Sequence, residues 1–236
     1  MSVHPDVLVI GAGVIGLTTA VTLAEAGYRV RIHTAEAHDQ TTSAVAGALW
    51  GPWLVEPRER VLPWAETTLD VLRNLAATPH SGVRLASGIE ISNASHGPPD
   101  WAHLLPDRRP LSPHELPPGY AHGHRYTAPL IDMPTYLAHL ADRLARAGGT
   151  VEHHRIDSIE QVTRLADCVV NCSYSQCPRP GSDEGHAVRP GAWTRLSYHR
   201  LSYHRRSTSA TSAGLVSGCS VESLGSIPAA SPPCVL

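Results

Sequence analysis

The sequence contains no lysine and no phenylalanine, so all 19 of its basic residues are arginines. We attribute both absences to GC-rich coding DNA and draw no function from them. No apolar run reaches the ~20 residues that a membrane-spanning helix needs. The net charge is only -2, so there is also no excess of positive charge of the kind that general nucleic-acid binding requires. We therefore expect neither a membrane nor a nucleic acid as a partner.

We expect no secretion signal at the N-terminus. No basic residue precedes the apolar stretch that starts at Val7, and glycines interrupt that stretch. The cysteines are odd in number and late in the chain: Cys168, Cys172, Cys177, Cys219 and Cys234. This pattern predicts reduced thiols in a cytoplasmic protein, with Cys168 and Cys172 as small buried residues of a strand rather than metal ligands. The 15 histidines show no ligand spacing, so we predict no metal site and place most histidines at the surface or in loops.

Strand-like and helix-like patterns alternate over the first 173 residues. We expect strands at 7–10, 30–33, 151–156 and 168–172, a strand pair around 83–91, and helices at 17–24, 62–77 and 134–147. Continuous apolar runs such as Val7–Ile10 are typical of parallel strands that are covered on both faces. The alternation predicts an α/β fold with a mostly parallel sheet.

The sequence changes character after Ser173. Residues 174–236 are rich in serine, proline and glycine and contain a perfect tandem repeat, Arg195–His199 followed by Arg200–His204. Such a composition buries too little apolar surface to offset the entropy lost on ordering the chain. We therefore expect this tail to be largely disordered.

A glycine-rich motif lies directly between the first strand and the first helix. Its residues are Gly11, Ala12, Gly13, Val14, Ile15 and Gly16. The first glycine makes the tight turn, the second lets the backbone approach a pyrophosphate, and the third lets helix and strand pack closely. Glu36 follows Gly16 by 20 residues, where an acid can accept hydrogen bonds from ribose hydroxyls. The motif predicts a dinucleotide site.

Three hydroxyl residues, Thr41, Thr42 and Ser43, follow the second strand, and the small residues 46–48 come next. The hydroxyls can donate to phosphate oxygens, and small residues permit close approach of the backbone to a flat ring system. A helix cap followed by a short helix of small residues explains the same pattern. The residues alone leave both interpretations open.

Together these segments resemble the bacterial type of D-amino-acid oxidase. The resemblance covers residues 5–173. It is also carried by three later segments of that range: Ile131–Leu137, Gly148–Glu152 and Val169–Ser173. It implies a Rossmann-type FAD-binding domain with an inserted, mostly antiparallel substrate domain, incomplete at the C-terminus. The implied boundaries are 1–79 and 133–173 for the FAD-binding domain, 80–132 for part of the substrate domain, and 174–236 for a divergent tail.

The resemblance also implies a role for particular residues. Gly11 to Gly16 would hold the pyrophosphate, and Ala35 and Glu36 the ribose side. Thr41, Thr42 and Ser43 would bind phosphate and ribitol, while Gly47, Ala48, Leu49 and Trp50 would line the edge of the isoalloxazine. Ile156 would meet the adenine through its backbone, Ser173 would lie near the diphosphate, and Trp53 would face the substrate cavity.

The implied activity is the oxidation of D-amino acids to keto acids, ammonia and hydrogen peroxide. After Ser173, however, Tyr174 stands where the family has glycine, and the family's substrate-binding arginine and tyrosines have no matching context. An altered frame or a truncation near this point is the simplest interpretation. We therefore assign no catalytic residue and expect activity at or near background. The alternatives are a non-catalytic FAD-binding fragment, and a related glycine or D-aspartate oxidase. An NAD-dependent dehydrogenase fits the first glycine motif alone.

Overall fold

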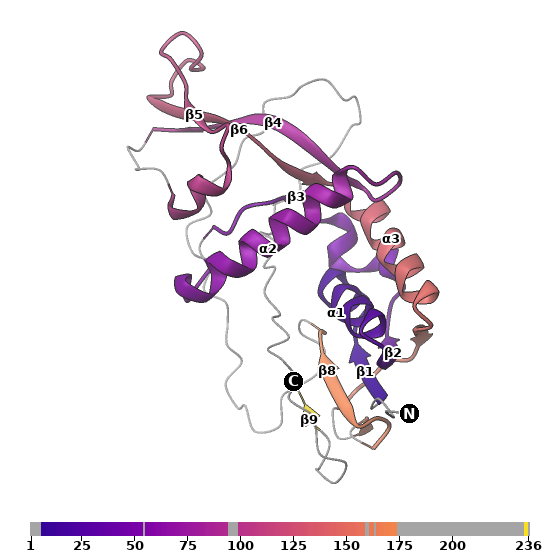
Figure 1. Cartoon of the computed structure of the whole chain (residues 1–236). Coiled ribbons are helices and arrows are strands. Elements are labelled where there is room, and N and C mark those ends of the chain that lie inside the picture. Colours follow the sequence, from indigo (N-terminus) through magenta and orange to yellow (C-terminus); the bar gives the residue numbers. More distant parts are fainter. Residues whose placement is uncertain are drawn as a thin grey trace.

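A computed structural model describes residues 6–53, 55–93, 99–158, 161–162 and 164–173, together with the backbone of a two-residue strand at 234–235. Figure 1 shows two sheets with helices packed beside them. In the parts of the chain that the structure describes, no helix is both long and apolar enough to span a membrane.

The first sheet is parallel throughout. It comprises β1 (Asp6–Ile10), β2 (Arg29–Thr34), β7 (Thr150–His153), β8 (Cys168–Asn171) and β9 (Cys234–Val235), in the order β7-β2-β1-β8-β9. In the centre, Val9 pairs with Ile32 on one side and with Val170 on the other. Strands with both faces covered are built from continuous apolar runs, and Val7–Ile10 is such a run. The predicted parallel sheet is confirmed.

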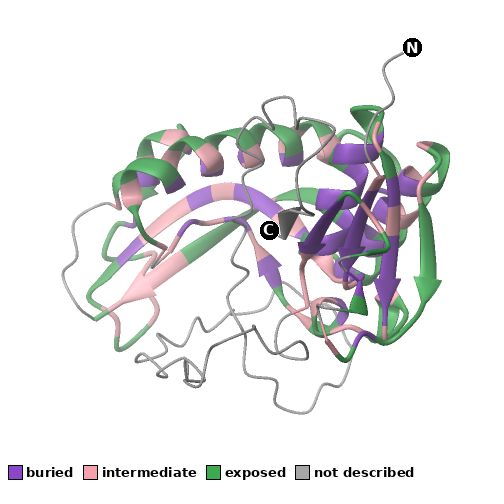
Figure 2. Cartoon of the chain, turned by 90° about the horizontal axis from the view of Figure 1, so that it is seen from below, coloured by how far each residue is buried: buried purple, intermediate pink, exposed green. Residues whose placement is uncertain are grey.

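Two helices cover one face of this sheet. They are α1 (Val14–Glu25) and α3 (Met133–Arg146), and Leu17 and Leu137 are completely buried between them and the strands. The opposite face carries a smaller cluster of Leu8, Ile10 and Val169, covered by Ile156 and Val162 from the segment after β7. Figure 2 shows the central strands buried.

The second sheet is antiparallel and adjoins α2 (Arg58–Ala76). It contains β3 (Ala48–Leu49), β4 (Val83–Ser92), β5 (Arg109–Pro110) and β6 (His122–Ile131), with β6 between β3 and β4. Three short 3-10 helices complete the described elements: η1 (His38–Gln40), η2 (Thr42–Val45) and η3 (Asp100–Leu104). A backbone hydrogen bond of 2.8 Å from Asp132 to Gly82 ties the end of β6 to the start of β4.

The structure differs from the sequence-based expectations at one strand pair and one helix. The strand pair around 83–91 is wrong, because β4 is one continuous strand whose partner, β6, lies some 30 residues further along the chain. The helix expected at 62–77 begins earlier, at Arg58, and contains Pro63 in its interior. The expected disorder of residues 174–236 falls outside the described residues, apart from 234–235, which form β9 beside β8.

Candidate functional site: a glycine cradle at the edge of the parallel sheet

The turn that leaves β1 depends on two glycines. Gly11 has a φ of +100°, which side chains other than glycine rarely adopt, and its amide donates to the His33 carbonyl at 2.8 Å. A Cβ at Gly16 would lie 1.9 Å from the carbonyl oxygen of Gly11. The first glycine therefore sets the direction of the turn, and the third lets α1 pack against it, as the motif predicts.

Helix α1 begins at Val14, directly after Gly13, the second glycine of the motif. The first-turn amides of a helix have no acceptor within the helix, and the helix dipole places partial positive charge beside them. One of these amides, that of Val14, donates to the Ser43 hydroxyl oxygen at 3.0 Å. A Cβ at Gly13 would lie 3.1 Å from the same oxygen. Ser43 and Gly13 thus lie against each other at the helix end, where the partial positive charge suits an anionic group.

The three predicted hydroxyl residues differ in their surroundings. Ser43, on η2, lies against the glycine loop. Thr41 donates its hydroxyl proton to the His38 carbonyl at 2.8 Å, which closes the turn of η1, and Thr42 is exposed. The structure thus forms a short helix at Thr42–Val45, but Thr41 makes no side-chain capping hydrogen bond and the small residues 46–48 lie after the helix. It also brings one hydroxyl, that of Ser43, to the glycine loop. The role of these hydroxyls toward a phosphate stays a prediction.

The ends of β2 and β7 form the second part of the site. The Thr34 hydroxyl donates to the Glu36 carbonyl at 2.7 Å, and the His154 amide donates to the Thr34 carbonyl at 2.9 Å. A small cavity of about 40 Å³ lies here, and Ala35 and Ile156 help to line it. Its other lining residues are Ile10, Gly11, His33, Thr34, His154, Arg155 and Ser173. Glu36 itself is exposed at the end of β2.

The end of β8 closes the site beneath the loop. The Cys172 amide donates to the Ile10 carbonyl at 2.9 Å, and the Cys172 carbonyl oxygen would lie 3.0 Å from a Cβ at Gly11. Both the amide and the hydroxyl of Ser173 donate to Asn171 Oδ1, at 3.0 and 2.6 Å. Ser173 is therefore held in place at the edge of the small cavity.

His33 is a residue of this site that the sequence analysis missed. It lies in β2, as the expected strand at 30–33 implies, and it is only 5% exposed, so it is one of the histidines that do not lie at the surface or in a loop. Its Nε2 lies 3.2 Å from Glu152 Oε2, and its ring centroid lies 5.1 Å from that of His154. Burial lowers the pKa of His33, Glu152 opposes that shift, and His154 and Arg31 add to it. A signal was present in the sequence, since ligands gather where parallel strands end.

The residues predicted at the flavin edge lie on the second sheet. Ala48 and Leu49 form β3, and no atom lies within 4 Å of a Cβ at Gly47. The Trp50 indole is buried, and its N–H donates to the Ala65 carbonyl at 3.2 Å. The ring of Trp50 is therefore part of the core, and only its main chain remains for a contact with a ligand.

An aromatic cluster surrounds Trp101, a residue for which sequence reasoning found no role. Trp50, Trp53 and Tyr126 each meet the Trp101 ring edge-on, at centroid distances of 5.8, 5.3 and 6.4 Å. Trp101 is 1% exposed, whereas Trp53 is partly exposed. The cluster holds Trp53 beside the loop that leads to α2.

The arrangement is suited to a dinucleotide, with a glycine loop, a helix N-terminus, a serine hydroxyl and a cavity at the ends of two parallel strands. The glycine positions fit such a group closely, because a Cβ would fill the space at Gly13 and is excluded at Gly16. Among the residues that the structure describes, no group of three or more His, Cys, Asp or Glu side chains could hold a metal ion.

Comparison with known proteins agrees with this geometry. The family described as "FAD dependent oxidoreductase" (DAO) matches residues 6–210. A D-amino-acid oxidase of Rubrobacter xylanophilus is 47% identical over 167 residues, which cover 70% of this chain and 51% of the relative. A D-amino-acid oxidase of Streptomyces coelicolor is 44% identical over 171 residues, 71% of this chain and 52% of the relative. The chain thus spans about half the length of these relatives.

Among solved structures, glycine oxidase from Geobacillus kaustophilus has a TM-score of 0.55 at 18% identity. The match covers 73% of this chain and 56% of that protein. At this level of identity the likeness concerns the fold alone.

Proposed function

The chain belongs to the DAO family of FAD-dependent oxidoreductases and is a homologue of D-amino-acid oxidases, and from that premise we propose that its glycine cradle binds FAD. The observation that carries the proposal is the arrangement of Ser43 and Gly13 at the start of α1. There the Ser43 hydroxyl oxygen lies 3.0 Å from the Val14 amide, and Gly13 presents bare backbone, since a Cβ on it would lie 3.1 Å from the same oxygen. Close approach of a pyrophosphate needs this combination of open backbone and helix N-terminus.

We assign the binding roles as follows. The pyrophosphate lies against Gly11, Ala12, Gly13, Val14, Ile15 and Gly16, with Ser43 beside it and Thr41 and Thr42 in the same segment. The adenosine end lies against Ala35, Glu36 and Ile156, with Ser173 at the edge of the cavity. The isoalloxazine edge lies against Gly47, Ala48, Leu49 and the main chain of Trp50. Residues 1–79 and 133–173 would then form the FAD-binding domain, and 80–132 part of a substrate domain.

The proposed substrate class is a D-amino acid, and the flavin, when bound, supplies the acceptor for a hydride. The protein's own contribution is position and electrostatics. The helix N-terminus places partial positive charge against the diphosphate. The Trp101 cluster holds Trp53 at the edge of the second sheet, where it would limit the access of water and shape the substrate side.

We further propose that this chain turns over D-amino acids at or near background. The curated relatives match it over only about half of their length. The arginine that binds the substrate carboxylate in the family has no matching context in this sequence. Without it, a substrate loses a bidentate, charge-assisted contact and its orientation over the flavin.

A peroxide assay tests the proposal. The chain, incubated with excess FAD and then desalted, is given D-alanine, with L-alanine as the blank and the Rubrobacter xylanophilus D-amino-acid oxidase as the positive control. We expect retained flavin without peroxide above the blank. Retained flavin with D-alanine-dependent peroxide would refute the absence of turnover, and a chain that retains no flavin would refute the cofactor site. Glycine and D-aspartate, tested in parallel, address the two related oxidase activities.

A further inference from the structure

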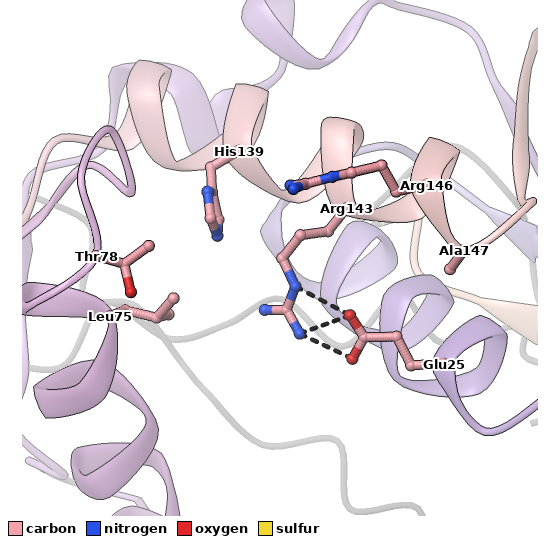
Figure 3. Close-up of a pocket in the computed structure, with 7 residues that line it drawn as sticks. All are labelled: Glu25, Leu75, Thr78, His139, Arg143, Arg146 and Ala147. Carbon is pink, nitrogen blue, oxygen red and sulfur yellow. Dashed lines mark hydrogen bonds and ion pairs between the residues drawn. The ribbon is translucent and has the colours of Figure 1, made fainter.

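A groove lies at the opposite end of α1 from the glycine loop, about 18 Å away for a helix of this length. It has a volume of about 470 Å³ and lies where α1, α2 and α3 all end (Figure 3). Its lining residues are Glu25, Leu75, Thr78, His139, Arg143, Arg146 and Ala147. The volume falls in the range of small-molecule sites, and no residue of the groove takes part in the proposed FAD site.

Basic side chains predominate in the groove, and one of them is already paired. Arg143 holds the Glu25 carboxylate through Nε and Nη2 at 2.8–3.1 Å. Arg146 uses only its Nε, which donates to the Asp142 carbonyl at 3.2 Å. Its two terminal nitrogens meet no acceptor in the described part of the chain. Arg146 is exposed, so its terminal nitrogens are open to solvent and available to a ligand in the groove.

His139 supplies an independent observation. The residue as a whole is half-buried, but its Nε2 is buried and has no hydrogen-bond partner among the described residues. Figure 3 shows the ring pointing toward Thr78 and Leu75, on the same helix face as the two arginines. Burial lowers the pKa of His139, Arg143 and Arg146 lower it further, and Asp142 opposes them. A buried polar atom of this kind calls for a partner that the chain itself does not supply.

The end of α3 alone does not explain these side chains. Basic residues in a last turn offset the partial negative charge at the helix C-terminus, and this accounts for a cation at Arg146. It does not account for the buried Nε2 of His139, which has no partner among the described residues. His139 cannot serve as a further cation at the helix end, because protonating it beside Arg143 and Arg146 is unfavourable. A negatively charged group in the groove would satisfy the imidazole and the free guanidinium together.

We propose that this groove binds a small organic anion, held by Arg146 and His139 through its phosphate or carboxylate and by Leu75 and Ala147 through its apolar body. Bare inorganic phosphate would fill only part of the volume and leave the apolar side uncovered. The paired Arg143 adds attraction at short range, whereas Glu25 repels the anion and keeps the affinity moderate. The site is separate from the glycine cradle and does not depend on it.

The test follows the imidazole proton signals by NMR during titration with phenyl phosphate, hexanoate or inorganic phosphate. His139→Asn identifies the signal of His139. We expect a saturable shift of that signal with phenyl phosphate or hexanoate, accompanied by a higher pKa of His139, and at least about tenfold weaker binding of inorganic phosphate. Whichever organic probe binds more tightly identifies the anionic group.

Two variants and one control make the test specific. Arg146→Gln should weaken binding by about tenfold, because a charge-assisted contact is lost. Glu25→Gln should strengthen it several-fold, because a competing carboxylate is removed. Arg109→Gln, at an exposed arginine on the second sheet that pairs with Glu115, should leave binding unchanged. The proposal is overturned if the His139 signal shows no saturable shift at millimolar probe, if every histidine shifts alike, or if Arg146→Gln binds as the parent does.

Discussion

Replacing Gly13 by alanine should weaken FAD binding while leaving the stability of the fold nearly unchanged. Gly13 has a φ of −73°, which any residue adopts, and the new Cβ would meet only the Ser43 hydroxyl oxygen at 3.1 Å. A hydroxyl group can move by a few tenths of an ångström. Alanine also reduces the conformational freedom of the unfolded chain, which stabilises the fold by about 0.4–1 kcal/mol. We expect the free energy of unfolding to change by less than about 1 kcal/mol.

Binding of FAD should respond differently. The added methyl group occupies the space through which the pyrophosphate approaches the helix N-terminus, so at least one charge-assisted hydrogen bond is lost. Such a bond contributes about 1.5–3 kcal/mol, and its loss raises the Kd by roughly 10- to 150-fold. Titration of FAD followed by flavin fluorescence gives the Kd, and urea unfolding without FAD gives the stability.

Two further glycines provide matched controls. Gly88→Ala, in β4, adds a Cβ with no atom within 4 Å and should leave FAD binding unchanged. Gly16→Ala places a Cβ 1.9 Å from the Gly11 carbonyl oxygen and should destabilise the fold itself by about 3 kcal/mol or more. A folded Gly13→Ala protein that binds FAD as tightly as the parent would refute the cradle as the pyrophosphate site.

Three other predictions concern stability, and each is measured by urea unfolding. Trp101→Ala removes the centre of the aromatic cluster and should cost about 3–5 kcal/mol; a cost below 1 kcal/mol would show that the cluster contributes little. Glu25→Gln breaks a half-exposed ion pair with Arg143 and should cost less than about 1 kcal/mol, checked by a double-mutant cycle with Arg143→Gln. Burial lowers the pKa of His33 below the usual 6.5, so the unfolded chain binds this proton more tightly than the folded chain. Above about pH 6.5 this group does not lower the free energy of unfolding, and below that pH the free energy of unfolding declines as the unfolded chain takes up the proton. His33→Gln should flatten the decline; an unchanged slope would contradict the assignment.

The glycine loop and the parallel strands could be predicted from the sequence because both are local features. Val7–Ile10 is a continuous apolar run, and the spacing of Gly11, Gly13 and Gly16 directly specifies a turn from strand to helix. Each signal lies within a few residues of the structure that it describes.

The features that the sequence did not predict depend on contacts between distant residues. The partner of β4 is β6, and nothing local to Val83–Ser92 identifies a strand some 30 residues away. The burial of His33 results from the segment after β7, which folds over β2. Trp101 packs against rings contributed by two other parts of the chain. Tertiary packing decides all three, so a single sequence read by periodicity misses them.

The most direct test of the account is a visible absorption spectrum of the purified chain, supplied with FAD, desalted, and recorded under anaerobic conditions before and after D-alanine is added. The account predicts a flavin band that survives desalting and is not bleached by D-alanine. A band that bleaches would show a working active site and contradict the proposed absence of turnover. The absence of any band would contradict the central claim that the cradle from Gly11 to Ser43 binds FAD.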